Sequence, residues 1–144
     1  MTEVRGAGER CDFCAIIAGE LPRNIRHEDD EFVVFRNKLE WAPVMWLVVP
    51  RRHMGQVEFW TSPLFERGAR LAVAVGEQDA PGGFRIVSNF GGDAAQSQLH
   101  GHLHVLGGAD LGLYMDWPGK GDYRRIVYGG RRASGPAPQA ERRE

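Results

Sequence analysis

The sequence has no excess of charge of either sign. Its 144 residues include 18 Lys and Arg against 19 Asp and Glu, which gives a formal net charge of −1. No global field therefore draws the chain to nucleic acid or to an anionic membrane. We expect neither partner, and any recognition of phosphate must come from a local arrangement of groups.

Long hydrophobic runs are missing as well. The stretch 42–50 is among the longest, and it falls far short of the roughly 20 apolar residues that a membrane helix needs. The first residues, MTEVRGAGERCDF, carry neither the apolar core of a secretion signal nor the Arg-rich, acid-poor composition of a transit peptide. We therefore expect a cytoplasmic protein.

Cysteine is scarce, because the chain has only Cys11 and Cys14. Two cysteines do not make the disulfide framework of a small secreted domain. In a reducing compartment a C-x-x-C pair instead indicates metal binding or redox chemistry. Which of the two applies depends on partners elsewhere in the chain.

The composition that is present, 42% hydrophobic and 26% charged, is typical of one soluble domain with a sizeable core. Residues 1–10 are polar, and residues 131–144 combine Pro, Ala and charge without apolar periodicity. We expect both ends to be disordered tails. This leaves 11–130 as the working domain.

Apolar periodicity predicts helices and strands in a mixed order. Phe13, Ile16 and Ile17 fall at helical spacing, and a second helix is expected to start at Ser62 and Pro63, an N-cap and a first helical residue. Runs of β-branched and aromatic residues predict the strands. The expected elements are a helix at 12–19, strands at 32–35 and 44–49, a helix at 62–76, and strands at 84–88 and 99–106. This order favours an α+β fold, an antiparallel sheet with the helices on one side.

Three of the five histidines stand at His100, His102 and His104. In a strand the side chains alternate with period two, so the three imidazoles would share one face at a spacing of about 7 Å. Imidazole titrates near neutral pH, so one ring can be a nucleophile while its neighbours donate hydrogen bonds to phosphate. This face is therefore expected to be a row of catalytic imidazoles or a metal site.

The residues before the histidines suit a phosphate. Asn89, Gln96, Ser97 and two glycines supply short side chains and accessible backbone N–H groups. Two other interpretations stay open at this point. The histidine face could be a solvated strand surface or a histidine-rich metal binder, or it could hold a catalytic zinc ion with three His ligands.

The segment Q-S-Q-L-H-G-H-L-H-V-L-G-G, from Gln96 to Gly108, resembles the signature of the histidine triad superfamily, H-x-H-x-H followed by two apolar residues. The resemblance extends to C-D-F-C-A-I-I-A-G-E-L-P from Cys11, H-E-D-D-E-F-V-V-F-R-N from His27, A-P-V-M-W-L-V-V-P-R-R-H ending at His53, and I-V-S-N ending at Asn89. It covers nearly all of 11–108, in the order typical of the nucleotide-binding branch and its zinc-bearing bacterial type. The resemblance implies about five antiparallel strands with two helices, and a homodimer with the 62–76 helix as the candidate interface.

By this resemblance His102 is the nucleophile that attacks the α-phosphorus of a nucleotide, and water then releases the nucleoside monophosphate. His104 would contact phosphate oxygens, Ser97 would donate to the leaving group, and Asn89 would hold phosphate. Gln96 is a further candidate for a residue that holds the phosphate. The chemical step would need no metal.

The resemblance also implies an apolar pocket for a purine base under the first helix, with Phe13 and Ile16 as its walls. Helical spacing alone would make both of them ordinary core residues. At the ribose position the chain has Asn37 where many small members carry Asp, followed by Lys38 where an apolar residue is common. Because the branch that cleaves diadenosine polyphosphates uses Asn there, this departure bears on the substrate subclass and not on the chemistry.

Zinc-bearing members pair an N-terminal C-x-x-C with two histidines, which correspond to His53 and His100. The resemblance therefore implies a structural zinc site made of Cys11, Cys14, His53 and His100, closed to substrate. In the alternative, both thiols are simply reduced and partly buried, and His100 serves as a hydrogen-bonding partner of His102.

The implied activity is hydrolysis that splits a nucleoside monophosphate from an amine, in a phosphoramidate, or from another nucleotide, in a dinucleoside polyphosphate. One alternative is nucleotidyl transfer to phosphate or a sugar phosphate. Against it, His104 stands where the uridylyltransferase relatives have Gln. The other alternative is a nucleotide-binding scaffold without catalysis, against which the intact triad, Ser97 and Asn89 argue.

Overall fold

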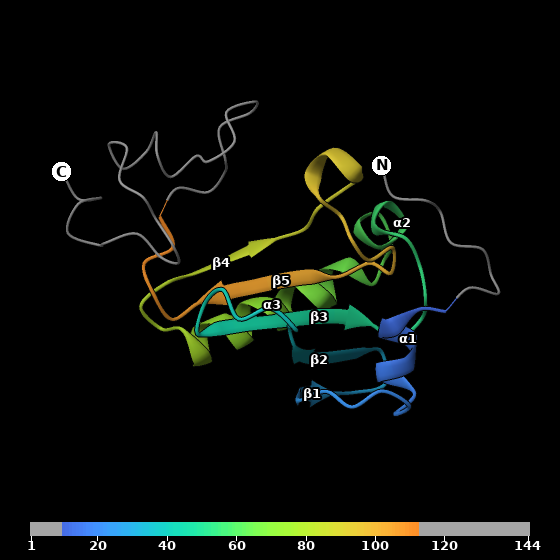
Figure 1. Ribbon diagram of the computed structural model, residues 1–144, viewed down its shortest axis with the longest axis horizontal. Coiled ribbons are helices and arrows are strands. Elements are labelled where there is room, and N and C mark those ends of the chain that lie inside the picture. Colours follow the sequence, from blue (N-terminus) through green and yellow to red (C-terminus); the bar gives the residue numbers. More distant parts are fainter. Residues whose placement is uncertain (1–9, 113–144) are drawn as a thin grey trace.

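The computed structural model describes residues 10–112 (Figure 1). Its elements are α1 (Asp12–Ile17), β1 (Ile25–Glu28), β2 (Phe32–Arg36), β3 (Val44–Pro50), α2 (Gln56–Trp60), α3 (Phe65–Asp79), β4 (Phe84–Val87), the 3₁₀ turn η1 (Gly92–Ala94) and β5 (Leu103–Gly107). The predicted C-terminal tail, the predicted domain end at 130 and nearly all of the predicted N-terminal tail lie outside the described residues. None of the helices between residues 10 and 112 has the length and apolar character needed to cross a bilayer.

The five strands form one antiparallel sheet in the order β1-β2-β3-β5-β4. In the register of β3 with β5, Leu47 lies opposite His104 and Val48 lies opposite Leu103. Figure 1 shows α3 running along the sheet and α1 lying at the end of β3. The predicted α+β fold with an antiparallel sheet of about five strands is confirmed.

Alternate residues of the central strands are buried on opposite faces of the sheet. Val34 of β2 shares a buried cluster with Ala72 of α3. Its neighbour Val33 shares a second cluster with Phe13 and Ile16 of α1. Helices therefore cover both faces, and the expectation that they lie on one side of the sheet was wrong.

The last strand is shorter than the sequence predicted. It begins at Leu103 and not at residue 99, so His100 and His102 precede it. The backbone N–H of Gly101 donates to the Met54 carbonyl oxygen at 2.7 Å, which docks this segment on the chain entering α2 and not on a neighbouring strand. A Cβ at Gly101 would lie 3.1 Å from the carbonyl oxygen of Gly55 and closer still to Phe59, so the close approach depends on glycine.

The helix expected at 62–76 begins later and ends later, as α3 at Phe65–Asp79. Ser62 is not its N-cap. The Ser62 Oγ accepts from the N–H of Leu64 at 3.1 Å and shapes the turn before the helix. The short elements β1 and α2 had no strong apolar periodicity and were not predicted.

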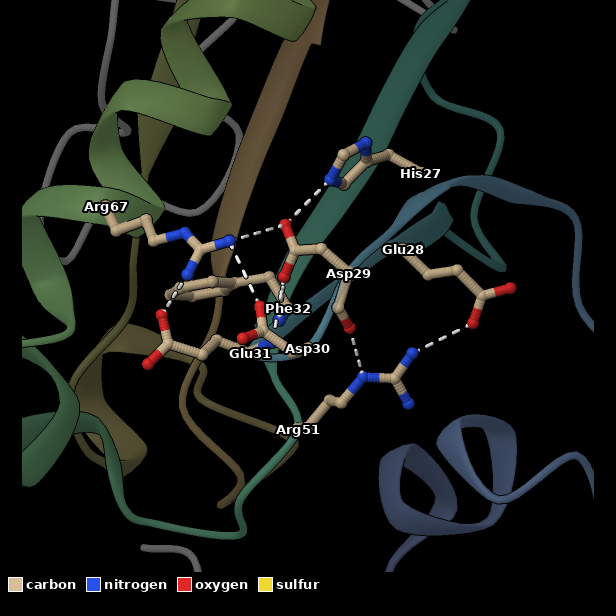
Figure 2. A network of polar contacts seen from close by, with 8 residues as sticks. All are labelled: His27, Glu28, Asp29, Asp30, Glu31, Phe32, Arg51 and Arg67. Atoms are coloured by element: carbon tan, nitrogen blue, oxygen red, sulfur yellow. Dashed lines mark hydrogen bonds and ion pairs between the residues drawn. The ribbon is translucent and has the colours of Figure 1, made fainter.

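Acidic residues follow one another in the turn between β1 and β2, where arginine side chains reach them (Figure 2). Asp29 Oδ1 accepts hydrogen bonds from the backbone N–H groups of Glu31 and Phe32, both at 2.8 Å. Asp29 Oδ2 lies 2.8 Å from His27 Nε2 and 3.3 Å from the guanidinium of Arg67 on α3. Burial alone would raise the pKa of Asp29, but these hydrogen bonds and the Arg67 charge hold it at about 2. The carboxylate therefore ties the turn to α3.

We expect Asp29→Ala to lower the free energy of unfolding by roughly 1–3 kcal/mol at neutral pH, because the backbone donors and Arg67 lose their acceptor. The folded pKa of about 2 lies below the ordinary value of 3.8. The stabilisation is therefore fully present above the ordinary value and is lost as the pH falls through the folded one. Urea unfolding at neutral pH and at about pH 3 measures the difference between the two proteins, which should shrink in acid.

Asp30→Ala is the matched control for this prediction. Its side chain is 82% exposed and lies 3.3 Å from Arg67, so the substitution should change stability by no more than about 0.5 kcal/mol. Equal losses in the two variants would contradict the role assigned to Asp29.

Candidate functional site

Four metal-ligating side chains meet beside the end of β3. Cys11 is the N-cap of α1, and its Sγ accepts from the N–H of Cys14. His100 Nδ1 lies 3.5 Å from Cys11 Sγ and 3.6 Å from Cys14 Sγ, and His53 Nδ1 lies 3.3 Å from Cys14 Sγ. All four ligand atoms lie within 4.8 Å of one another. The structure thus brings together the four residues that the resemblance named, close enough to bind one metal ion.

The geometry fits a tetrahedral ion. Zinc bonds of about 2.3 Å to sulfur and 2.0 Å to nitrogen separate neighbouring ligand atoms by roughly 3.5–3.8 Å. The three sulfur–nitrogen contacts of 3.3–3.6 Å lie near this range, and all four ligand atoms fall within 4.8 Å. His100 Nε2 lies 2.7 Å from the carbonyl oxygen of Pro50, so it donates there and leaves the Nδ1 lone pair facing both sulfur atoms. Burial, followed by the hydrogen bond and charge of Cys11, raises the pKa of Cys14 to about 11. With this raised pKa, Cys14 is a thiolate at neutral pH only when a bound cation displaces its proton.

His102 lies just before β5 and is held by several contacts, among them a hydrogen bond from Ser88 Oγ to its carbonyl oxygen at 2.5 Å. Its Nδ1 donates to the carbonyl oxygen of His100 at 2.7 Å, which leaves the lone pair on Nε2. Its backbone N–H donates to Gln56 Oε1 at 2.8 Å. Its ring packs edge-on against Phe13 with 5.1 Å between centroids. Burial lowers the pKa of His102, partly opposed by the bond to His100, so the ring is neutral near pH 7.

His104 lies inside β5 on the α1 side of the sheet, because its neighbours Leu103 and Val105 belong to the cluster on the α3 side. The rings of His104 and His102 are 4.9 Å apart. Burial, and then the neighbouring His102, lowers the pKa of His104 to about 4. A neutral His104 can exchange hydrogen bonds with a phosphate but brings no charge to it.

A cleft of about 250 Å³ opens at these two histidines and is also lined by Phe13, Asn37 and Ser97. Five residues of the predicted nucleotide site therefore surround one space. The cleft is completed by Asp12, Arg23, Lys38, Leu39, Leu47 and Gln98. A larger hollow of about 620 Å³, between the α3–β4 turn and residues 108–112, has no histidine or cysteine in its lining and offers no comparable chemistry.

Asn37 is a buried polar residue whose side chain already has one partner. Its Oδ1 accepts from the N–H of Leu39 at 2.9 Å, and its backbone N–H donates to the Met45 carbonyl oxygen. The amide nitrogen of Asn37 is then the group left to meet a ligand oxygen, such as a ribose hydroxyl.

The loop before the histidines is braced by its own side chains. Gln96 Oε1 accepts from the N–H of Gly91 at 2.8 Å, and Gln96 Nε2 donates to the Gln98 carbonyl oxygen at 3.0 Å. The carbonyl oxygen of Asn89 accepts from Gln56 Nε2 at 3.1 Å. Gln96 therefore holds the shape of the loop, and neither it nor Asn89 is among the residues that line the cleft.

Ile16 is the one predicted base-wall residue that does not line the cleft. It shares a buried cluster with Phe13 and Leu47, but unlike those two residues it does not line the cleft. Of the two residues that the resemblance assigned to a base wall, only Phe13 is in a position to contact a ligand in this cleft.

Sequence reasoning missed Gln56 and gave no role to Arg23 or Lys38. Gln56 is only 4% exposed, and nothing in the pattern around it signals that burial. Arg23 and Lys38 line the cleft. The one signal that could have identified Lys38 is its place directly after Asn37 in the sequence.

The family model described as HIT domain matches residues 18–111. The chain is similar to an uncharacterized HIT-like protein of Chlamydia muridarum, with 33% identity over 104 residues that cover 69% of this chain and 82% of the relative.

Two solved structures share the fold. A HIT family hydrolase from Clostridium thermocellum has a TM-score of 0.68 and 33% identity, over 74% of this chain and 97% of that one. A histidine triad protein from Clostridium difficile has a TM-score of 0.67 and 30% identity, over 74% of this chain and 99% of that one.

Proposed function

Because this chain belongs to the HIT domain family, we propose that it is a nucleotide hydrolase whose nucleophile is Nε2 of His102. One observation carries the proposal: a buried, neutral imidazole has its Nδ1 bound to the His100 carbonyl oxygen and lines the cleft. A neutral ring with its lone pair on the opposite nitrogen is ready to attack. The hydrolase among the solved relatives supports the same reaction class.

The reaction would proceed in two displacements at the α-phosphorus. The Nε2 lone pair of His102 forms a P–N bond while the bond to the leaving group breaks, and the leaving group takes a proton through Ser97. Water then attacks the same phosphorus, and the P–N bond breaks. The proton that water loses returns to Ser97 and replaces the one given to the leaving group. The products are a nucleoside monophosphate and the protonated leaving group, and the imidazole returns to its neutral form.

The other cleft residues would bind and orient the substrate. His104 hydrogen-bonds a phosphate oxygen, Asn37 meets the ribose, and Phe13 packs against the purine base. Phe13 also contacts the His102 ring, so the base wall and the nucleophile are held by one side chain. Asn89 and Gln96 are proposed to act through the loop that surrounds the phosphate.

We also propose that Cys11, Cys14, His53 and His100 hold a structural zinc ion, since their donor atoms and spacing fit one. The ion would supply a fixed crosslink between α1, the end of β3 and the segment before β5. It takes part in no step of the reaction. His100 links the two sites, because its carbonyl oxygen accepts from the His102 ring.

Incubation of the purified protein with adenosine phosphoramidate and with diadenosine polyphosphates tests the function. We expect AMP as a product of at least one, with one oxygen from solvent when the reaction is run in ¹⁸O-water. Transfer to added phosphate, with ADP as the product, would instead identify a phosphorylase. If neither substrate is consumed while AMP still binds, the hydrolase proposal fails and the alternative of a non-catalytic nucleotide-binding scaffold is favoured.

The charge of the cleft favours the polyphosphate as substrate. The acidic residue that lines the cleft, Asp12, forms an ion pair with Arg10 at 3.4 Å. Arg23 and Lys38 make no ion pair within residues 10–112, and Arg23 stacks over the Phe35 ring at 6.0 Å. Two such cations attract a leaving group that carries phosphate more than they attract a neutral amine.

We expect Lys38→Met to lower kcat/KM for diadenosine polyphosphate by about threefold, because one exposed cation contributes only weakly to the binding of an anion. The value for adenosine phosphoramidate should stay within about twofold. Steady-state kinetics with both substrates measures the ratio. The control is Arg52→Met, which removes an exposed cation that pairs with Glu58 outside the cleft; equal losses on both substrates in Lys38→Met would refute the preference.

We further propose a homodimer through the exposed face of α3. Val73 is 41% exposed there and lines a shallow hollow with Glu66, Arg70 and Glu77. Sedimentation equilibrium should return twice the chain mass of 16.1 kDa; the mass of a single chain at micromolar concentration would reject the dimer.

A further inference from the structure

Gln56 is the first residue of α2, and its side chain is almost fully buried. Its Oε1 accepts from the backbone N–H of His102 at 2.8 Å, and its Nε2 donates to the carbonyl oxygen of Asn89 at 3.1 Å. One amide therefore joins the backbone of the proposed nucleophile to the loop proposed to surround the phosphate. These two partners come from segments 13 residues apart in sequence.

The position of His102 needs such a tether because the residue lies outside the sheet. It precedes β5, so no ladder hydrogen bond fixes its backbone. The neighbouring Gly101 is held by its own bond to the Met54 carbonyl oxygen, which fixes the chain one residue earlier. At His102 itself, Ser88 Oγ donates to the carbonyl oxygen at 2.5 Å, and the bond to Gln56 is the one that holds the backbone N–H.

We propose that Gln56 is a positioning residue that sets the place of His102 relative to the Asn89 loop, and so aligns the imidazole with the phosphorus of the substrate. This inference rests on the proposed function. Gln56 is buried behind the backbone and does not line the cleft. Its loss should therefore reduce the rate of the chemical step and leave ligand binding largely intact.

Two substitutions separate the two hydrogen bonds of the amide. Gln56→Met keeps the length of the side chain and removes both bonds. Gln56→Glu keeps an acceptor for the His102 N–H and removes the amide donor to Asn89. Val57→Ala is the matched control, because Val57 is the next residue of α2 and is 66% exposed.

The first readout is amide hydrogen exchange in the full chain, followed by NMR. In Gln56→Met the His102 N–H should exchange at least about tenfold faster, because its acceptor is gone. The Gly101 N–H should be unchanged, since its acceptor is the backbone of Met54. In Gln56→Glu the His102 N–H should stay protected.

The second readout is steady-state kinetics on the substrate that the native protein cleaves. Gln56→Met should lower kcat by about ten- to a hundredfold with KM within about threefold, as expected for a misplaced nucleophile. Gln56→Glu should retain more of kcat than Gln56→Met. Val57→Ala should match the native protein in both readouts.

Three results would overturn the proposal: unchanged His102 exchange in Gln56→Met, equal acceleration at His102 and Gly101, or a native kcat in a variant whose exchange has changed. If Gln56→Met does not fold, Gln56→Glu and its exchange pattern decide alone. Absence of turnover in the native protein would reject the proposed function, and the exchange data would then still establish or reject the tether.

Discussion

Replacing His102 with Asn is expected to lower kcat by at least about a thousandfold, because the substitution removes the nitrogen nucleophile and no water-activating base takes its place. The rest of the site should survive. The backbone N–H that donates to Gln56 is unaffected, and an Asn amide can still donate to the carbonyl oxygen of His100. Binding of AMP, measured by calorimetry, should therefore stay within about threefold of the native value.

Rapid acid quench with substrate labelled at the α-phosphorus gives the sharper readout for this prediction. The native protein should carry the label covalently during turnover, and His102→Asn should carry none. His27→Asn is the matched control, because it removes an imidazole that faces Asp29 and not the cleft. More than about a tenth of native kcat in His102→Asn would end the case for this nucleophile.

The buried strands could be predicted because their residue types strongly favour β-structure. Residues 32–35 and 44–49 are rich in β-branched and aromatic side chains, and all of them except Val44 and Trp46 are buried in a sheet covered on both faces. Burial on both faces also erases the alternation that would tell which face meets which helix. The sequence pattern therefore predicted β2 and β3, but it could not place α1 and α3 on opposite faces.

The histidines show the limit of a period-two argument. His104 lies in β5 as the pattern predicted, but His100 and His102 lie before the strand. In a regular strand the three imidazole rings would lie evenly spaced on one face in similar surroundings. The bend at Gly101 instead separates them, so that His100 faces the two cysteines and His102 faces the cleft. The contacts that decide this, from Gly101 to Met54, His100 to Pro50 and His102 to Gln56, join residues far apart in sequence.

Tertiary contacts also explain why Gln56 was missed and why Phe13 lines the cleft whereas Ile16 does not. Phe13 and Ile16 both lie on the buried face of α1, and one turn of helix separates a cleft wall from a core residue. Gln56 looks like any polar residue at the start of a helix until its two partners are known. Roles that depend on which backbone atom lies opposite cannot be derived from residue type and spacing.

Removing the metal is expected to have the largest effect on stability. A chelator should lower the free energy of unfolding by at least about 3 kcal/mol, or Tm by roughly 12 °C or more for a domain of this size. Complete unfolding is not expected, because α1 is also anchored by Phe13 and Ile16 in a buried cluster. The value of kcat should fall as well, since His100 would lose its ligand partners and its carbonyl oxygen orients the His102 ring.

Metal analysis of the native protein should return about one equivalent of zinc, bound in a four-coordinate site. The double variant Cys11→Ser, Cys14→Ser supplies the control: it should bind none, unfold at the Tm of the chelated native protein, and show no further shift when chelator is added. A shift of the same size in the double variant would mean that the chelator acts elsewhere. Less than about half an equivalent of zinc in the native protein would leave the cluster of Cys11, Cys14, His53 and His100 as reduced thiols packed against imidazoles, with His100 acting on His102 alone.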